Sequence, residues 1–415
     1  MYPRFLECLL IDPEIKGAMA FIAGPRQVGK TTCAKNWLEK KGGVYVNWDD
    51  EATRRRYRQD SHFFESELRQ SGPKSGLVLD EIHKIPKWKT LIKGYYDTLG
   101  TEFDLLVTGS ARLEYFHQSG DSMLGRYHLL HMSPLVPHEV LGKVKKKSSL
   151  VIDFSSPVQK FIEQKMVLPD ALSTLIDFSG FPGIYQKQSQ RALNLWHREY
   201  RQRLIREDLH DLTRIIDYLR AEHLYDLLPH RVGSPLSLNS LREDLNASHE
   251  AIRLLMAAFE KLYILFHIKP YFKKVAYSLK KEPKIYFYDW TQIPDAGARF
   301  EDFIAVQLKA FCDFVSDGGW ASLELFYLRT KQKREVDFLV VKDKKPWMMV
   351  EVKNGEGSYT KTSLDYFHQL LKPEVSVCVS AEPGIFKKVS PNQWNLSAVR
   401  FMNLLWERVG FSASP

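Results

Sequence analysis

The sequence has few cysteines, no long apolar segment and no start that resembles a secretion signal. Its four cysteines lie far apart and form no C-x-x-C pair, which argues against a zinc site or a disulfide framework and favours small core residues. They are Cys8, Cys33, Cys312 and Cys378. No apolar run approaches the ~20 residues that cross a bilayer, and residues 1–5 lack the pattern of a secretory leader. We therefore expect a cytoplasmic protein with no membrane partner.

The composition is that of a folded protein with several domains. Of the 415 residues, 44% are hydrophobic and 26% charged, and there is no internal repeat or low-complexity segment. This length predicts two to four domains. The net charge of +9, with a pI near 9.1, favours a polyanion such as DNA as a partner.

A complete phosphate-binding motif, G-x-x-x-x-G-K-[ST], follows the apolar run 18–23. Its residues are Gly24, Pro25, Arg26, Gln27, Val28, Gly29, Lys30 and Thr31. The glycines let backbone N–H groups point at phosphate, Lys30 supplies positive charge, and the Thr31 hydroxyl is a magnesium ligand. A helix that begins at Lys30 adds its positive dipole end, and we include Thr32 in the predicted nucleotide site. The alternative is a glycine turn between a strand and a helix.

A second apolar run, 77–79, ends in two adjacent carboxylates, which favours the nucleotide site over the simple turn. Asp80 is predicted to hold the magnesium ion that Thr31 also contacts, and Glu81 to orient and deprotonate the attacking water. A third strand, 103–107, leads into Thr108 and Ser110, which are candidates for sensing the γ-phosphate. An ordinary turn after the strand is the alternative for this last segment.

Changes of pattern divide the chain into four predicted parts. A basic stretch at 143–149 ends a P-loop ATPase domain, 1–147. A helical lid or linker, 148–212, contains a helix over 192–212 with apolar residues at three-to-four spacing. The turn at 178–183 is predicted to pack on a neighbouring domain.

Residues 213–283 show the order of a winged helix. Helices are predicted at 237–245 and 249–261, with Ser237 or Asn239 capping the first, and a strand follows at 263–268. His249 and Arg253 would then face outward on the second helix, where contacts with DNA are made. A helical module that only bridges domains or subunits is an equal alternative.

The last part, 284–415, has the predicted order αβββαβ: a helix over 297–311 with Glu301, strands at 323–329, 335–342 and 347–352, a helix over 363–371 and a strand at 375–380. The pleat puts Glu351 and Lys353 on one face, and the tight return at 343–346 lets Asp337 join them. Such a site can bind magnesium through Asp337 and Glu351, with Lys353 stabilising charge. Glu335 is a rival for Asp337, and a sheet edge with solvated charges is the alternative.

These motifs together resemble a large family of prokaryotic AAA-type ATPases with a C-terminal restriction-endonuclease-like, PD-(D/E)xK domain, often described as a domain of unknown function. The likeness covers nearly the whole chain. Besides the phosphate-binding loop, the matching segments are 2–4, 79–81, 108–110, 122–126, 180–182, 335–337 and 351–353. The resemblance implies an α/β multidomain fold, ATP and magnesium as ligands, ATP hydrolysis, and a winged helix between the two ends.

The resemblance also implies a homo-oligomer, because AAA-type enzymes commonly supply an arginine to the γ-phosphate from a neighbouring subunit. Arg126 is our candidate and Arg112 the alternative. Three functions remain open: an ATP-driven enzyme that remodels or translocates DNA, a regulatory or defence switch that binds a protein partner, and a slow ATPase that holds an oligomer together. In the first, the C-terminal domain grips DNA or cuts it through Glu301, Asp337, Glu351 and Lys353.

Overall fold

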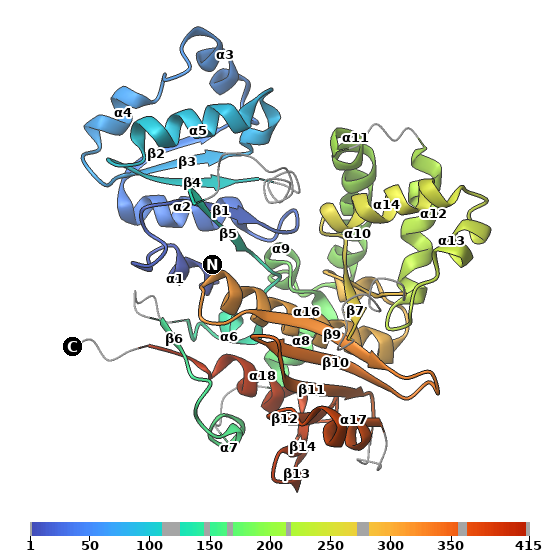
Figure 1. Ribbon diagram of the computed structural model, residues 1–415. Coiled ribbons are helices and arrows are strands. Elements are labelled where there is room, and N and C mark those ends of the chain that lie inside the picture. Colours follow the sequence, from blue (N-terminus) through green and yellow to red (C-terminus); the bar gives the residue numbers. More distant parts are fainter. Residues whose placement is uncertain are drawn as a thin grey trace. The chain divides into compact units, whose positions relative to one another are not determined.

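The computed structural model describes residues 2–109, 125–144, 150–163, 169–212, 217–271, 282–355 and 363–411 (Figure 1). Its contacts divide the chain into two compact units. The first unit comprises Met1–Ser133, Val144–Leu150 and Phe411–Pro415, and the second comprises Pro134–Lys143 and Val151–Gly410. None of the helices in the described ranges is both long and apolar enough to span a membrane.

The first unit is built on a five-stranded parallel sheet in the order β2-β3-β4-β1-β5. The strands are β1 (Met19–Ala23), β2 (Gly43–Asn47), β3 (Gly76–Asp80), β4 (Asp104–Thr108) and β5 (Tyr127–His131). Since the central strands β3, β4 and β1 are covered on both faces, they read as continuous apolar runs, which is why the sequence revealed them.

Helices cover both faces of this sheet, with α2 on one and α5 on the other (Figure 1). The helical segments are α1 (Leu6–Leu9), α2 (Lys30–Lys41), α3 (Glu51–Gln59), α4 (Glu65–Gln70), η1 (Ile82–Lys84) and α5 (Trp88–Leu99). The helix predicted to begin at Lys30 does so, with Gly29 as its N-cap. The alternation of strand and helix places the ends of β1, β3 and β4 along one edge of the sheet.

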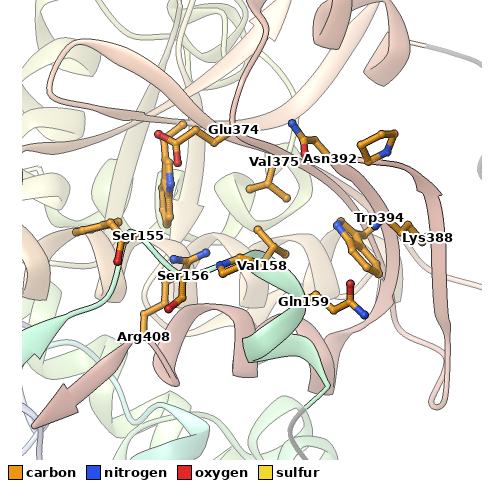
Figure 2. Close-up of a pocket in the computed structure, with 14 residues that line it drawn as sticks. Ser155, Ser156, Val158, Gln159, Glu374, Val375, Lys388, Asn392, Trp394 and Arg408 are labelled. Atoms are coloured by element: carbon orange, nitrogen blue, oxygen red, sulfur yellow. The ribbon is translucent and has the colours of Figure 1, made fainter.

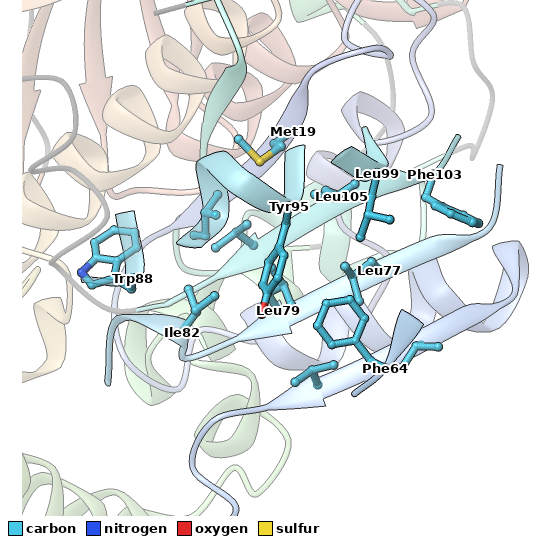
Figure 3. Close-up of a cluster of buried hydrophobic side chains, with 14 of the residues drawn as sticks. Met19, Phe64, Leu77, Leu79, Ile82, Trp88, Tyr95, Leu99, Phe103 and Leu105 are labelled. Carbon is cyan, nitrogen blue, oxygen red and sulfur yellow. The ribbon is translucent and has the colours of Figure 1, made fainter. Parts of the chain in front are cut away.

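The core between the sheet and α5 is a cluster of buried aromatic and aliphatic side chains (Figure 3). Phe64, Ile92, Leu77 and Leu79 are fully buried in it, and Tyr95 of α5 is 1% exposed. Alternate residues of β3 and β4 enter this cluster because the side chains of a strand alternate between its two faces. The packed core fixes the strands whose ends carry the polar residues of the predicted site.

The second unit contains an eight-stranded mixed sheet in the order β13-β14-β12-β11-β10-β9-β7-β8. Its strands are β7 (Leu265–Pro270), β8 (Lys284–Phe287), β9 (Leu323–Arg329), β10 (Glu335–Lys342), β11 (Lys345–Lys353), β12 (Val375–Ser380), β13 (Phe386–Ser390) and β14 (Gln393–Ser397). Two short strands, β6 (Leu150–Ile152) and β15 (Val409–Phe411), form a separate sheet. Thus β7 and β8 belong to the same sheet as the later strands β9 to β14.

The helices of the second unit fall into two groups. The first group precedes the large sheet or lies between its first strands: α6 (Pro137–Val140), α7 (Val158–Ile162), α8 (Pro169–Phe178), α9 (Pro182–Tyr185), α10 (Gln190–Arg203), η3 (Leu204–Asp208), α11 (Leu209–Leu212), α12 (Tyr218–Leu227), η4 (Leu228–Arg231), α13 (Leu238–Asp244), α14 (His249–Lys261) and η5 (Trp290–Gln292). The second group is α16 (Ala296–Asp317), α17 (Ser363–Leu371) and α18 (Ala398–Trp406), which pack on the sheet.

Most predicted elements of this unit are confirmed, but some details differ. The helix predicted over 192–212 contains a π-helical turn, η3, at Leu204–Asp208. Ser248 caps α14 by accepting a hydrogen bond from Ala251 N (3.1 Å), but Ser237, at the N-cap of α13, makes no such bond. The strands β13 and β14 and the helix α18 were not predicted.

The turn at 178–183 packs tightly within the second unit, and its packing on a neighbouring domain stays a prediction. Gly180 lies so close to Pro134 and Trp290 that an added Cβ would come within 2.8 Å of each. The Gly180 carbonyl accepts a hydrogen bond from Leu135 N (2.7 Å). Pro134 and Leu135 follow β5 in the chain but are grouped with the second unit. All four cysteines are buried, in agreement with the expectation of core residues.

Candidate functional site

The predicted phosphate-binding loop connects β1 to α2 and has an unusual backbone. Gly24 and Gly29 have φ of 149° and 107°, and Gln27 has φ of 63°, a left-handed conformation that a non-glycine residue seldom adopts. A Cβ on Gly24 would lie 2.3 Å from the Met132 carbonyl oxygen. The loop therefore needs glycine at this position both for conformation and for space. Pro25, Arg26 and Val28 complete it, and Thr32 lies in the first turn of α2.

Lys30 is held against the loop itself. Its ammonium donates hydrogen bonds to the carbonyl oxygens of Gly24 (2.8 Å) and Pro25 (2.7 Å), and the side chain is 7% exposed. A buried ammonium needs such polar partners, because removing a charge from water is otherwise costly. The positive charge is thus fixed at the loop where phosphate groups are expected.

Arg4 lies in one of the segments that resemble the family and holds the phosphate-binding loop by a hydrogen bond. Its guanidinium donates to the carbonyl oxygens of Val28 (2.8 Å) and Ser133, and the residue is 6% exposed. This brace links the N-terminal segment to the loop and to the chain after β5. Sequence reasoning gave Arg4 no role, because nothing in its local pattern indicates a partner 24 residues away.

Thr31 and Asp80 meet at the edge of the sheet. The Thr31 hydroxyl donates to Oδ2 of Asp80 at 3.0 Å, and Asp80 is 3% exposed. Tyr45 from β2 and Thr108 from β4 also donate to the Asp80 carboxylate. The parallel register explains this convergence, because Asp80 pairs with Asn47 on one side and with Thr108 on the other. A hydroxyl and a carboxylate are ligands that magnesium prefers, so these residues fit a magnesium ion.

Glu81 follows Asp80 directly, with φ of 58°. Burial is the main reason that the pKa of Glu81 is raised to about 7, against the opposing charge of Lys30. The His83 ring nitrogen Nε2 lies 3.5 Å from Glu81 Oε2. A left-handed glutamate at the end of a buried strand is a strained arrangement of the kind found at functional sites. Tyr45 and His83 are the site neighbours that the sequence did not indicate.

The remaining predicted site residues of the first unit are the arginine candidates and the γ-phosphate sensor candidates. Arg126, just before β5, forms an ion pair with Asp97 at 3.1 Å, and its side chain is 33% exposed. Ser110 and Arg112 lie outside the described residues. Thr108, the other sensor candidate, is fully buried and bonded to Asp80. The role of Arg126 in a neighbouring subunit therefore stays a prediction.

The predicted residues of the C-terminal part also come together. Glu301 extends from α16, Asp337 and Glu335 from β10, and Glu351 and Lys353 from β11. Phe338 pairs with Val350 in the antiparallel register, so Asp337 lies opposite Glu351. The Lys353 ammonium donates to Glu351 at 2.7 Å. The two candidates Asp337 and Glu335 belong to one group, which we call the carboxylate cluster: Glu301, Glu335, Asp337 and Glu351.

An unexpected residue, Lys284, lies within the carboxylate cluster. It begins β8 and is 1% exposed. Its ammonium is 2.6 Å from Glu335, 3.5 Å from Glu301 and 3.6 Å from Asp337. Burial alone would lower the pKa of Lys284, but the three neighbouring carboxylates outweigh this effect and the pKa is raised. A protein cation thus lies within the carboxylate cluster, beside Asp337 of the predicted metal-binding pair Asp337 and Glu351.

The carboxylates have further partners in the protein. Four hydrogen bonds hold them: from the Tyr286 hydroxyl to Glu301 (2.7 Å), from the Val352 N–H to Asp337 (2.8 Å), from Arg329 to Glu335 (2.8 Å) and from Lys353 to Glu351 (2.7 Å). Burial, followed by the charge of Asp337, raises the pKa of Glu301 and of Glu351 to about 7. Across the described ranges, no group of three or more histidine, cysteine or acidic side chains is arranged to hold a metal ion.

Described residues of the second unit line two of its cavities. One, of about 340 Å³, is lined by Glu301, Lys353, Gly233 and Asn354 and so adjoins the carboxylate cluster. The other, of about 250 Å³, is lined in part by two tryptophans and Arg408 (Figure 2). Its Arg408 guanidinium donates to backbone carbonyl oxygens, one of them at 2.8 Å, and its tryptophans are nearly buried. We assign no ligand to this second cavity.

The helices α13 and α14 and the strand β7 follow one another in the predicted order, whereas β8 lies in the segment that the sequence assigned to the last part. β7 and β8 form an antiparallel pair. Arg253 on α14 is 60% exposed and forms an ion pair with Glu250 of the same helix at 2.6 Å. The exposed position of Arg253 agrees with the expectation for an outward face, and the neighbouring His249, at the start of α14, is also exposed.

Three segments of the chain match known protein families. Residues 16–141 match a family described as an AAA domain. Residues 169–291 and 296–396 match two domains of unknown function, DUF8612 and DUF4143. The N-terminal part is therefore an AAA-type P-loop ATPase domain, which confirms this part of the expectation from the sequence. The C-terminal match carries no description of its activity.

Similar proteins give little functional detail. Two uncharacterised proteins, Mb2031c of Mycobacterium bovis and Rv2008c of Mycobacterium tuberculosis, are each 22% identical over 371 residues, covering 82% of this chain and 74% of theirs. A solved signal transduction ATPase with numerous domains and a tetratricopeptide repeat sensor, from Pyrococcus horikoshii, aligns with 12% identity and a TM-score of 0.30. That alignment covers 77% of this chain and about half, 48%, of the solved chain.

Proposed function

We propose that this chain is a magnesium-dependent ATP hydrolase that acts on DNA. The observation that carries the hydrolase assignment is the contact between the Thr31 hydroxyl and Asp80, with Glu81 next to it and Lys30 fixed on the phosphate-binding loop. Thr31 and Asp80 would hold the magnesium ion. When bound, the ion neutralises charge on the phosphate oxygens.

The protein's own residues would carry out the other parts of the reaction. Lys30 and the loop N–H groups bind the phosphates and keep their charge compensated. Glu81 orients the attacking water and accepts its proton, and burial has moved the pKa of Glu81 close to neutrality, where a general base works best. Tyr45 and Thr108 position the Asp80 carboxylate.

DNA is the proposed partner for two reasons. The net charge is +9, and α13, α14, β7 and β8 have the order of a winged helix with Arg253 outward. Lysine and arginine that bind the phosphate backbone release counterions, so affinity should fall steeply as salt rises. Arg253→Glu should weaken binding to all DNA sequences alike. Arg69→Glu, an equal charge change in the first unit, is the matched control and should have little effect.

A protein-binding switch is the second candidate, and the position of Lys284 among the carboxylates favours it over a DNA-cutting enzyme. ATP turnover measured with and without single-stranded, duplex and branched DNA distinguishes the proposed DNA-acting ATPase from the protein-binding switch. Stimulation by any DNA form supports the proposed function. Unchanged turnover, together with binding that does not depend on salt, would favour the switch.

A further inference from the structure

We propose that Lys284 is the resident cation of the carboxylate cluster and takes the place of a divalent metal ion, so that this part of the chain binds its partner without metal-dependent cleavage. The inference does not depend on ATP hydrolysis. It concerns the site formed by α16, β10 and β11, where the sequence predicted magnesium.

The Lys284 ammonium is surrounded by carboxylates. The Lys284 ammonium has carboxylate oxygens of Glu335, Glu301 and Asp337 within 3.6 Å, and these come from a helix and a strand that converge on it. The Tyr327 ring centroid lies 5.5 Å from the same ammonium. A divalent ion bound by Glu301 and Asp337 together would need the space in which this ammonium lies. The lysine would have to leave before such an ion could bind there.

Moving Lys284 out of the carboxylate cluster would be unfavourable, because removing one partner of a buried ion pair leaves the other charge uncompensated. Lys284 is 1% exposed and begins a strand, β8, that pairs with β7 through four residue pairs. Its backbone is therefore fixed, and the side chain has carboxylates as its partners. The ammonium is a permanent member of the site.

Protein cations nearly balance the charge of the carboxylate cluster. The four carboxylates of the cluster face three protein cations: Lys284, Arg329 and Lys353. At most one formal negative charge is left over. A divalent ion added to this arrangement would produce a net positive charge in a largely buried site, which is unfavourable. The cluster is thus close to neutral without any metal ion.

Carboxylate oxygens of the cluster already accept hydrogen bonds from protein groups. Asp337 accepts from the Val352 N–H at 2.8 Å, and Glu301 accepts from the Tyr286 hydroxyl at 2.7 Å. Magnesium requires about six oxygen ligands in near-octahedral geometry. One oxygen, Oε2 of Glu351, is buried without a hydrogen-bond partner among the described residues. While Lys284 occupies the cluster, a single oxygen of this kind does not form a magnesium site.

The arrangement also links two segments of the chain that match different families. Lys284 lies in the match at 169–291, whereas the four carboxylates lie in the match at 296–396. Their pairing gives β8 a fixed position relative to β10. The cluster is therefore a buried electrostatic connection between the two segments.

Manganese counting tests the proposal. The full chain, without nucleotide, is titrated with Mn²⁺, and the bound metal is counted by electron paramagnetic resonance. Wild type and Asp337→Asn should bind equal amounts, because Asp337 already has Lys284 as its cation. Lys284→Met should gain a Mn²⁺ site, and adding Asp337→Asn should remove it. Lys309→Met, which removes a lysine paired with Asp313 elsewhere on α16, is the matched control and should gain nothing.

Each possible result of the Mn²⁺ titration either supports or overturns the proposal. A Mn²⁺ site in the wild type that Asp337→Asn abolishes would overturn the proposal, as would magnesium- or manganese-dependent nicking of DNA that the same substitution abolishes. A folded Lys284→Met that gains no site would also overturn it. If Lys284→Met does not fold, Lys284→Gln takes its place, and the comparison of wild type with Asp337→Asn needs neither variant.

Discussion

The Thr31 hydroxyl lies 3.0 Å from Oδ2 of Asp80, although 49 residues separate them in the sequence. The parallel sheet produces this contact, because the ends of β1 and β3 lie along the same edge. Three further groups converge there: the Tyr45 hydroxyl, the Thr108 hydroxyl and the Glu81 carboxylate. The chemistry that we assign to the first unit depends on this edge and on the loop that crosses it.

The close approach of Gly24 to the Met132 carbonyl makes a specific prediction. Gly24→Ala should force the loop to move, since its Cβ would lie 2.3 Å from that oxygen. We expect a loss of ATP affinity and a stability loss of about 1–3 kcal/mol. Gly94→Ala is the control, because an exposed glycine within α5 has nothing within 4 Å of its Cβ. The control should be as stable as wild type or slightly more so. Equal ATP affinity of Gly24→Ala and wild type, by calorimetry, would refute the role of the loop.

The oligomer prediction concerns Arg126. If this arginine acts on a neighbouring subunit, Arg126→Ala should lower turnover by on the order of 10³-fold and leave ATP binding intact. Mixing it with Lys30→Ala should then restore part of the activity. Asp97→Ala removes the present partner of Arg126 and should retain turnover. Equal losses in Arg126→Ala and Asp97→Ala would instead indicate that only their ion pair matters. A strict monomer by light scattering with ATP and DNA would contradict the shared site.

A buried acid on α16 predicts how stability depends on pH. Burial raises the pKa of Asp302 well above its ordinary value, although its carboxylate accepts a hydrogen bond from Phe287 N at 2.7 Å. The folded state then holds a proton that the unfolded state releases above about pH 4. This group therefore stabilises the fold at low pH, and its contribution is lost as pH rises towards the folded pKa.

Asp302→Asn keeps the oxygen that accepts from Phe287 but cannot ionise. The free energy of unfolding of this variant, relative to that of wild type, should therefore be higher at pH 8 than at pH 5. The difference should grow by about 1.4 kcal/mol for each pH unit in the range where Asp302 has lost its proton in the unfolded wild type but keeps it in the folded state. Thermal unfolding at the two pH values measures this. Parallel pH dependences of the two proteins would show that Asp302 stays ionised in the fold.

Much of the nucleotide site was predictable because its signals are local. The loop 24–31 has a fixed spacing, and the apolar run before Asp80 indicated a buried strand with carboxylates at its end. The same holds for Asp337 and Glu351, which belong to consecutive strands joined by a tight turn. In each case a short stretch of sequence determines the geometry.

The roles of Arg4, Tyr45 and Lys284 were not predictable in this way. Arg4 binds a loop 24 residues later, and Tyr45 reaches Asp80 from a neighbouring strand 35 residues earlier. Lys284 was read as the first residue of the last domain, and nothing in the sequence order shows that its strand would begin within reach of β10. Such contacts follow from the order of strands in a sheet, which periodicity does not give.

Steady-state turnover of Glu81→Gln is the sharpest test of ATP hydrolysis at Lys30, Asp80 and Glu81. With magnesium, we predict unchanged ATP binding and a fall in turnover of about 100-fold or more, the usual contribution of a general base. Lys30→Ala should instead weaken binding, and Glu39→Gln, an equal charge change on the exposed side of α2, should match wild type. Turnover by Glu81→Gln at the wild-type rate would show that Glu81 is not the general base of this site.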